Sequence, residues 1–289
     1  MRTVLSVWML LAACCAWGAG LGPWNPAQHA VNGFMPTQLP GIRLWLDANR
    51  AHRVGTTNID TWRDYSLWTD ANGTVSHAVQ SVDASYRPRF AHGLNGRPAC
   101  VFDGVDDRMA PQSYPSFPTN GVGFVMLLAV STTTGTNSQF AIWQGSQSGY
   151  AAPWDPPQPG SFGFLLNEDD SRNYLTNSVN MLFENGTDGA GTGGVVKTFT
   201  NKKPVHFLYM NNVGGSEGAK AYSKGKLMDT FTLSRCYEEY VWLGGKVQPY
   251  NNFDGGILEL FITGKALNEA QLVQCERYIR TKYGIVERQ

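Results

Sequence analysis

Short runs of apolar and β-branched residues recur along most of the chain, and glycine, asparagine, aspartate or proline separates them. In one run Val205, Phe207 and Tyr209 occupy every second position, which is the period of a β-strand. Residues 223–226 have the composition of a tight hairpin turn. Many short strands with turns between them are typical of a β-sandwich or a barrel. The predicted strands cover residues 42–46, 99–102, 123–130, 139–143, 162–166, 195–200, 205–210, 226–233, 240–243 and 257–262.

The pattern changes near the C-terminus, where apolar residues recur at helical spacing. Asn268 is a typical N-cap with a glutamine three positions later, and Gly284 is well placed to end a helix in the left-handed conformation. We therefore expect an all-β domain closed by one short amphipathic helix that packs against a sheet. The apolar positions of this helix are Leu272, Cys275, Ile279 and Tyr283.

The composition is that of a turn-rich extracellular β protein. Charged residues make up only 16% of the chain while glycine and aromatic residues are plentiful, which argues against a helical bundle. Lysine plus arginine and aspartate plus glutamate number 23 each, so no net field attracts nucleic acid or an anionic membrane. We expect no nucleic-acid partner.

The N-terminus has the pattern of a secretory signal, in which a positive residue precedes an apolar run and small residues follow it. We expect a signal peptide over residues 1–20, a segment over residues 21–40 that leads into the domain, and one domain over residues 41–289. The protein is then secreted or held on the extracellular surface.

The same N-terminal run also fits a bacterial lipoprotein signal that ends at Ala13. In that case Cys14 carries a lipid, and this anchor is the only link to a membrane that the sequence suggests. Removal of residues 1–20 leaves Cys100, Cys236 and Cys275, with no metal-binding spacing among them. We expect buried thiols, and one disulfide plus one thiol is the alternative.

Five motifs stand out along the chain: LWLDA at residues 44–48, WRDYS at 62–66, LNGRPACVFDGVDD at 94–107, and the segments 253–259 and 267–285. Together they resemble the secreted concanavalin A-like (laminin-G-like) β-sandwich family. The resemblance implies an antiparallel jelly-roll sandwich of two sheets, one of them concave, and a lectin-like role in binding carbohydrate. It also places Trp45 and Trp62 in the core. The chain differs from the family at Cys100 and Cys275, where aliphatic residues are usual.

Some relatives of this fold are glucanases whose two catalytic carboxylates share one face of a strand. The chain has no such E-x-D-x-x-E or E-x-D-x-E triplet, and the consecutive acids at residues 168–170 and 238–239 fit solvated turns. The sequence therefore favours a non-catalytic protein that binds a polysaccharide or glycan. The alternatives are a structural or adhesive surface protein that binds another protein, and a polysaccharide lyase or glycoside hydrolase.

Sugar sites need flat aromatic faces and planar polar groups. Trp154 lies in a proline-rich loop that cannot be a central strand, and Tyr150 and Asp155 lie beside it. A second aromatic, Tyr250, is followed by the amides of Asn251 and Asn252. These six residues are the candidate ligand contacts, and packing of the loops on the domain is the alternative.

Asp103, Asp106 and Asp107 occupy a turn that also contains glycine. Clustered carboxylates in a loop are hard ligands suited to Ca²⁺, whereas the simpler interpretation is that aspartate and glycine only shape the turn. Calcium is the one cofactor that the sequence suggests. Asp64, Asp254 and Glu259 face the same choice with weaker grounds for a metal.

Overall fold

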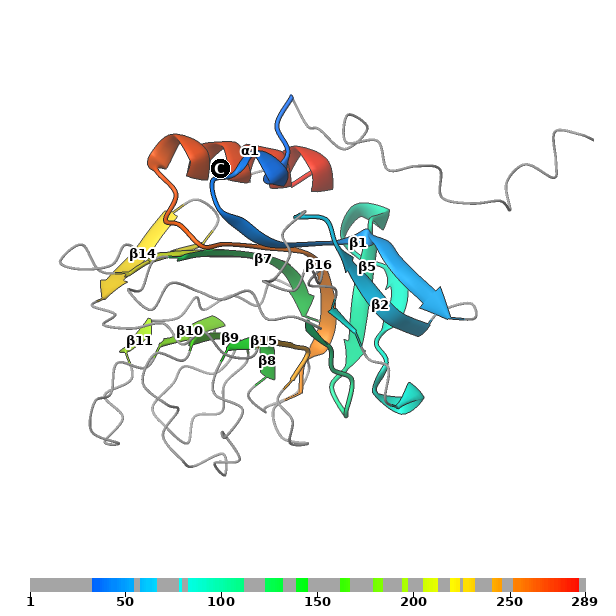
Figure 1. Ribbon diagram of the computed structural model, residues 1–289. Helices are drawn as coiled ribbons and strands as arrows, with labels where there is room; N and C mark the ends of the chain where they lie inside the picture. Colours follow the sequence, from blue (N-terminus) through cyan, green and yellow to red (C-terminus); the bar gives the residue numbers. More distant parts are fainter. Residues whose placement is uncertain are drawn as a thin grey trace, which may run out of the picture.

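The computed structural model describes residues 33–54, 58–66, 78–79, 83–111, 123–131, 139–144, 162–166, 179–183, 194–196, 205–212, 219–223, 226–231, 241–245 and 252–285. This part of the chain is mostly β-strand, and its strand pairings are antiparallel (Figure 1). One α-helix, α1 (Glu269–Tyr283), follows the last strand. The all-β prediction with a C-terminal helix is confirmed.

The larger sheet has eleven strands. Along it lie β14 (Lys226–Phe231), β13 (Ala219–Ser223), β12 (Val205–Asn212), β7 (Gly123–Ser131), β16 (Asp254–Thr263), β5 (Pro98–Asp103), β4 (Arg89–His92), β2 (Asn58–Asp64), β3 (Ala78–Val79) and β6 (Ala110–Pro111). The eleventh, β1 (Ile42–Val54), pairs with both β16 and β2. The first long strand therefore joins the last strand in the middle of the sheet.

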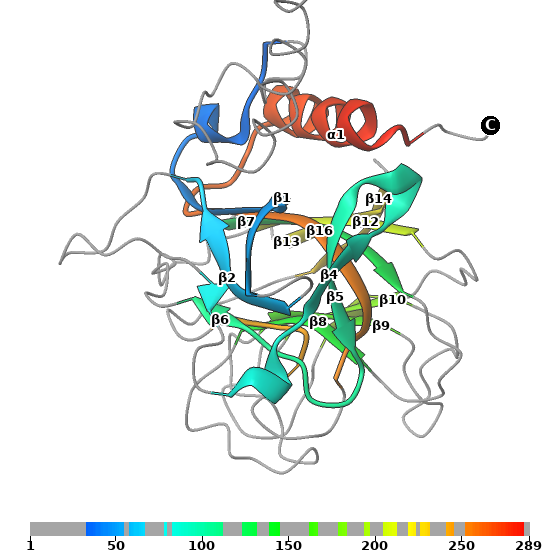
Figure 2. The same cartoon turned by 90° about the vertical axis from the view of Figure 1, so that its right-hand side faces the viewer.

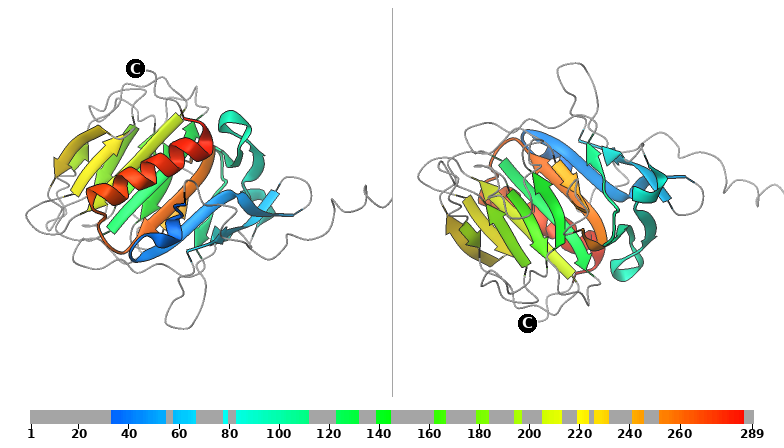
Figure 3. Two further views of the ribbon diagram at one scale, coloured as in Figure 1. Left: turned by 90° about the horizontal axis from the view of Figure 1, so that it is seen from above. Right: turned by 90° about the horizontal axis from the view of Figure 1, so that it is seen from below.

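The smaller sheet has five strands. Their order is β11 (Gly194–Val196), β10 (Val179–Phe183), β9 (Phe162–Leu166), β8 (Gln139–Gln144) and β15 (Val241–Leu243). Met109, which directly precedes β6, forms an isolated antiparallel bridge with Leu243, the last residue of β15. Figure 1 shows this sheet on one side of the larger sheet and α1 on the other, and Figure 3 shows the same two faces from above and below.

The central strands of the larger sheet are covered by α1 on one face and by the smaller sheet on the other (Figure 1), and they are buried along most of their length. Residues 255–263 of β16 are all buried, as are residues 44–48 of β1. A strand covered on both sides needs apolar residues at consecutive positions, which explains why these two runs lack alternation. Trp45 and Trp62 are 1% and 0% exposed, so the core positions predicted for both are confirmed.

Helix α1 begins and ends where the sequence predicts. Asn268 Oδ1 accepts a hydrogen bond from Gln271 N–H (3.0 Å), and Gln271 Oε1 accepts one from Asn268 N–H (2.9 Å), which forms a capping box. Gly284 has φ +62°, the left-handed conformation that ends the helix. The predicted apolar stripe is buried, together with one further residue, Tyr278.

The β4–β5 hairpin supports the C-terminal end of this helix. Asn95, in the 3₁₀ turn η4 (Leu94–Gly96), donates from Nδ2 to the carbonyls of Tyr283 (2.6 Å) and Gly284 (3.1 Å). Figure 2 shows the hairpin reaching up to that end of the helix. The last carbonyls of a helix lack partners within it, and Asn95 supplies a donor to two of the carbonyls at the end of α1.

The segment before β1 also packs against the helix. Residues 33–40 contain the short 3₁₀ turn η2 (Pro36–Gln38), and Met35 and Leu39 belong to the core cluster formed with α1. The ring of Phe34 meets Tyr278 edge to face, with centroids 5.8 Å apart. The segment that leads into β1 therefore packs against α1.

Cys100 and Cys275 are buried free thiols, as predicted. Burial raises the pKa of both thiols well above the ordinary value, so they resist ionisation and act as small apolar residues. Cys236 lies outside the described residues. No helix in the described part of the chain combines the length and apolar character needed to cross a bilayer.

Candidate functional site

Three acidic side chains gather in the turn that follows β5. Oxygen atoms of Asp103, Asp106 and Asp107 lie within 4.8 Å of one another. Asp103 Oδ1 accepts hydrogen bonds from the N–H groups of Val105 (2.8 Å) and Asp106 (3.3 Å), and Asp107 Oδ2 accepts one from Asp103 N–H (3.0 Å). Two of the aspartates therefore shape the turn, in line with the simpler interpretation. Calcium binding by the three together stays a prediction.

Asn252, one of the predicted ligand contacts, lies against this same turn. Its side chain donates from Nδ2 to the carbonyl of Val105, and the residue is only 6% exposed. The next residue, Phe253, accepts a hydrogen bond from Gly104 N–H (3.0 Å). Gly104 has φ +75°, and a side chain there would lie 2.8 Å from the Cβ of Asp254, so glycine is required. The hydrogen bonds of Asn252 and Phe253 therefore hold the acidic turn against the segment before β16.

The structure therefore brings together two sets of candidates that are far apart in the sequence. The predicted calcium ligands and Asn252 form one corner, which we call the acidic corner and define as Asp103, Asp106, Asp107 and Asn252. The other candidate ligand contacts lie outside the described residues, and their roles stay predictions. They are Tyr150, Trp154, Asp155, Tyr250 and Asn251.

Two buried carboxyl groups, Asp107 in the acidic corner and Asp64 on β2, have raised pKa values. Burial, reinforced by the charges of Asp103 and Asp106, raises the pKa of Asp107 to about 7. Burial also raises the pKa of Asp64 to about 6, although its Oδ1 accepts hydrogen bonds from the N–H groups of Trp45 and Ser66 (2.8 Å each). Both pKa values exceed the ordinary 3.8. Their contribution to stability is therefore present at low pH and is lost as the pH rises through about 6 to 7.

Asp107→Asn is expected to weaken the dependence of stability on pH. Asparagine keeps an oxygen for the Asp103 N–H but cannot ionise, so the loss of stability between about pH 5 and about pH 8 becomes smaller. Urea midpoints of the variant and the wild type at the two pH values measure this. The ionisation of Asp64 maintains part of the pH dependence of stability in both the variant and the wild type.

Asp83→Asn is the matched control for this measurement. Hydrogen bonds from Ser85 to the Asp83 carboxylate lower its pKa, so its contribution is present at higher pH and is lost as the pH falls. This variant should therefore not reduce the loss of stability on going from about pH 5 to about pH 8. An Asp107→Asn slope equal to the wild-type slope would show that Asp107 ionises normally.

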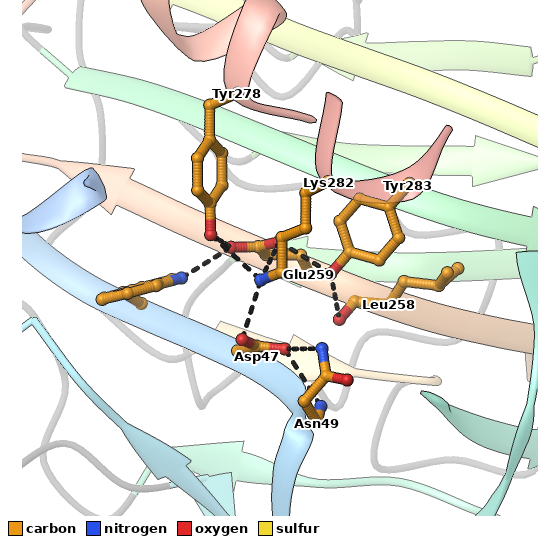
Figure 4. A network of polar contacts seen from close by, with 8 residues as sticks. Asp47, Asn49, Leu258, Glu259, Tyr278, Lys282 and Tyr283 are labelled. Atoms are coloured by element: carbon orange, nitrogen blue, oxygen red, sulfur yellow. Dashed lines mark hydrogen bonds and ion pairs between the residues drawn. The ribbon is translucent and has the colours of Figure 1, made fainter. Parts of the chain in front are cut away.

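A second polar cluster lies between α1 and the larger sheet (Figure 4). Asp47 on β1 faces Glu259 on β16 in the strand register, and both carboxylates are fully buried. Lys282 from α1 reaches between them, with Nζ 2.7 Å from Asp47 Oδ2 and 2.8 Å from Glu259 Oε2. The helix thus supplies the cation that two facing carboxylates need.

Aromatic side chains complete the environment of Glu259. Trp45 Nε1 (2.7 Å) and Tyr278 OH (2.8 Å) donate to Oε1, and Tyr283 OH (2.7 Å) donates to Oε2. With Lys282, four donors meet one carboxylate, which is about the number its lone pairs accept. We call Asp47, Glu259, Lys282, Tyr278 and Tyr283 the helix-sheet cluster. Asp47 and Glu259 are both 0% exposed, so a substrate does not reach this pair as it reaches the two acids of a glycosidase.

The acidity of the cluster follows from burial and from the shared cation. Burial alone would raise the pKa of Asp47, but Lys282 and the two hydrogen bonds from Asn49 outweigh it and lower the pKa. Burial, with help from Asp47, keeps the pKa of Glu259 raised despite Lys282. Burial opposes the ammonium form of Lys282, yet Glu259 and Asp47 raise its pKa. Because one cation serves two carboxylates, Glu259 takes up a proton more readily than Asp47 does.

Sequence reasoning did not find this cluster, although a signal was present. Asp47 and Glu259 each interrupt an apolar run in a strand that is buried on both faces. A lone charge in such a run must be paired inside the protein. Lys282 follows Ile279 by three positions, so it lies on the same side of the helix as the apolar stripe. These positions together indicate a buried ion cluster.

Comparison with known proteins gives a likeness of fold. No family model matches the chain, and no curated protein matches it. A Trypanosoma rangeli sialidase in complex with 2,3-difluoro-KDN is 12% identical with a TM-score of 0.50, covering 90% of this chain and 35% of that one. A Ruminococcus gnavus IT-sialidase CBM40 bound to α2,3-sialyllactose is 14% identical with a TM-score of 0.41, covering 54% of this chain and 82% of that one. The chain therefore spans about a third of the length of the sialidase and shares a β-rich fold with it.

Proposed function

We propose that the protein is an exported, non-catalytic carbohydrate-binding domain built as a concanavalin A-like jelly-roll sandwich. The contact that supports this proposal is that of Asn252 with the Asp103–Asp107 turn. It joins a candidate sugar-binding segment to a candidate calcium site, two features that the sequence suggests separately. Sites that combine a cation with amides and a nearby aromatic suit sugars, because hydroxyl groups need polar partners and the ring needs a flat apolar face.

In this proposal the ligand binds beside the acidic corner. Tyr250 and Asn251 directly precede Asn252 in the chain, so they are the nearest candidates in sequence to the corner. Trp154, with Tyr150 and Asp155, supplies the other aromatic contacts. The proline-rich sequence around Trp154 limits the freedom of the unbound loop, so less conformational entropy is lost on binding.

Calcium at the acidic corner would couple ligand binding to pH. A proton on Asp107, whose pKa is raised to about 7, competes with the cation for the same carboxylate. Calcium affinity should therefore increase as the pH rises through about 7. The Asp106 carboxylate is partly exposed at this corner and is open to a cation from solvent.

A glycan array with and without Ca²⁺ tests the proposed function. The panel should include sialylated glycans, because the solved structures of similar fold include a sialidase and a module bound to sialyllactose. Binding that depends on Trp154 supports the proposal, and Trp154→Ala should weaken it with little change in melting temperature. An empty array, or release of reducing ends or unsaturated products from polysaccharides, would contradict a non-catalytic lectin.

Asp106→Asn tests the calcium part separately. The variant should lower Ca²⁺ affinity measured by isothermal titration calorimetry, because one hard ligand loses its charge. The matched control is Glu269→Gln, which removes an exposed carboxylate from the first turn of α1. Equal Ca²⁺ affinities in the two variants would remove the acidic corner as a metal site, while leaving the glycan array to decide on sugar binding.

A further inference from the structure

In the helix-sheet cluster a lysine amine, an aspartate carboxyl group and a second carboxyl group are held together away from water. We propose that Lys282 and Asp47 condense to an intramolecular amide, with Glu259 carrying the protons. The product is a covalent cross-link between the first long strand of the domain and its last helix. It is independent of the proposed sugar binding.

The two reacting groups are hydrogen-bonded to each other. Lys282 Nζ lies 2.7 Å from Asp47 Oδ2, and Cγ of the carboxyl group is one bond beyond that oxygen. The fold therefore holds the amine and the carboxyl group side by side, as a condensation requires. Strand pairing places Asp47 opposite Glu259, so the acceptor and the proton carrier are fixed side by side. Glu259 Oε2 lies 2.8 Å from the same amine.

The surroundings make the net negative charge of this group costly. The side chains of Asp47 and Glu259 are 0% exposed, and that of Lys282 is 11% exposed. Rings of Trp45, Tyr278 and Tyr283 enclose the site and donate to Glu259. Two carboxylates and one ammonium leave an excess negative charge in a buried site, which is costly. Amide formation removes one carboxylate and the ammonium together and leaves one acid that can be neutral.

The step balances without any external reagent. The Lys282 ammonium passes a proton to the Asp47 carboxylate, which gives a neutral amine and a carboxylic acid. Nζ attacks Cγ, and an N–C bond forms while Glu259 accepts the second amine proton. Glu259 returns that proton to the departing hydroxyl group, the C–O bond breaks, and one water leaves. The enclosed site disfavours the return of water, and the bond needs to form only once in the life of the molecule.

The cross-link would join positions 235 residues apart. It would hold β1 at the centre of the larger sheet and fix α1 on its outer face. A link that closes so long a loop restricts the unfolded chain more than it changes the folded one. Such a domain would resist mechanical extension from its two ends. This resistance would be useful to a protein exposed outside the cell.

Tryptic peptide mapping of the full-length protein under reducing, denaturing conditions tests the proposal. The amide would block cleavage after Lys282 and yield a branched peptide in which residues 44–50 are joined to residues 281–288, one water lighter than the sum of the two. Detection of separate peptides 44–50, 281–282 and 283–288 alone would overturn the proposal. A branch that instead contains residues 247–265 would assign the bond to Glu259 and overturn the choice of Asp47 as acceptor.

Variants then test the role of each group. Glu259→Gln should lose the branched peptide while retaining both reacting residues, and Asp47→Asn should retain it with loss of ammonia in place of water. Glu276→Gln is the matched control, because it removes a carboxylate of α1 that pairs with Arg280 outside the cluster, and it should keep the branch. A persistent branch in a folded Glu259→Gln protein would remove Glu259 as proton carrier. The wild-type map decides the cross-link itself even where a variant fails to fold.

Discussion

Lys282→Met is expected to lower the free energy of unfolding by about 3–5 kcal/mol, the usual cost of removing one partner from a buried ion pair. Methionine fills a similar volume but leaves Asp47 and Glu259 facing each other, both fully buried, with no cation between them. Since a domain of this kind is stable by only about 5–15 kcal/mol, the variant should be close to unfolding. If the amide has formed in the wild type, its loss adds to the same effect.

The pH dependence of the stability of Lys282→Met separates the effect of the lost charge from the effect of altered packing. Without the ammonium, at least one of the two carboxyl groups should take up a proton, so its pKa rises in the folded state. A raised pKa contributes stability at low pH that is lost as the pH increases, so the variant should be less destabilised at about pH 5 than at about pH 8. Urea unfolding at both pH values, followed by circular dichroism, measures the difference.

The control for Lys282→Met is a charge removed from the same helix outside the cluster. Glu276→Gln breaks an i, i+4 pair with Arg280 (2.6 Å) whose side chains are about one-fifth exposed. Such pairs contribute about 0.3–0.5 kcal/mol, so the change should be roughly a tenth of that for Lys282→Met. Similar losses in the two variants would mean that the helix-sheet cluster contributes no more than a surface pair.

Trp45→Ala is expected to cost about 3–5 kcal/mol, because the indole is buried at the interface between β1 and α1. The variant removes both the ring and one of the donors to Glu259. Trp45→Phe separates these contributions, since phenylalanine keeps an aromatic ring but lacks the N–H. We expect about 1–3 kcal/mol for that change, which is the cost of leaving a buried charged acceptor short of one donor.

Trp62 provides an unusually close control for this series. It is 0% exposed, like Trp45, yet its Nε1 has no hydrogen-bond partner among the described residues. Trp62→Phe therefore removes a buried donor that is not satisfied there, and it should cost less than Trp45→Phe. Thermal unfolding of both variants tests this. Trp154→Ala belongs in the same series, and a loss of stability as large as that of Trp45→Ala would indicate that Trp154 packs in the domain and does not bind a ligand.

Much of the fold could be predicted from the sequence because apolar runs and capping residues act locally. Each predicted strand is present, Ser223 pairs with Lys226 where the predicted hairpin joins β13 to β14, and α1 has the predicted ends. The prediction missed β2, β3, β4, β6, β10 and β13. β2 contains three charged residues and only two large apolar residues, Ile59 and Trp62, so pairing with its neighbours defines it more than its own composition does.

The candidate site could be predicted only in part, for a related reason. The acidic turn is a local feature of five consecutive residues, so its aspartates were visible in the sequence. Its contact with Asn252 joins residues 147 positions apart and depends on how β5 pairs with β16. The helix-sheet cluster depends on three separate elements, and the apolar runs around Asp47 and Glu259 indicate buried charges without showing which residues pair with them. Long-range pairing carries no signal in a single sequence.

The position of β1 at the centre of the larger sheet has a consequence for the order of folding. Trp45 and Glu259 are 214 positions apart, so the ribosome must complete most of the domain before β1 can pair with β16. Until then β1 has only β2 to pair with in the sheet, and pairings of such long range as that with β16 form slowly. The domain should therefore fold after synthesis rather than during it, and it should depend on chaperones that hold the growing chain apart from its neighbours.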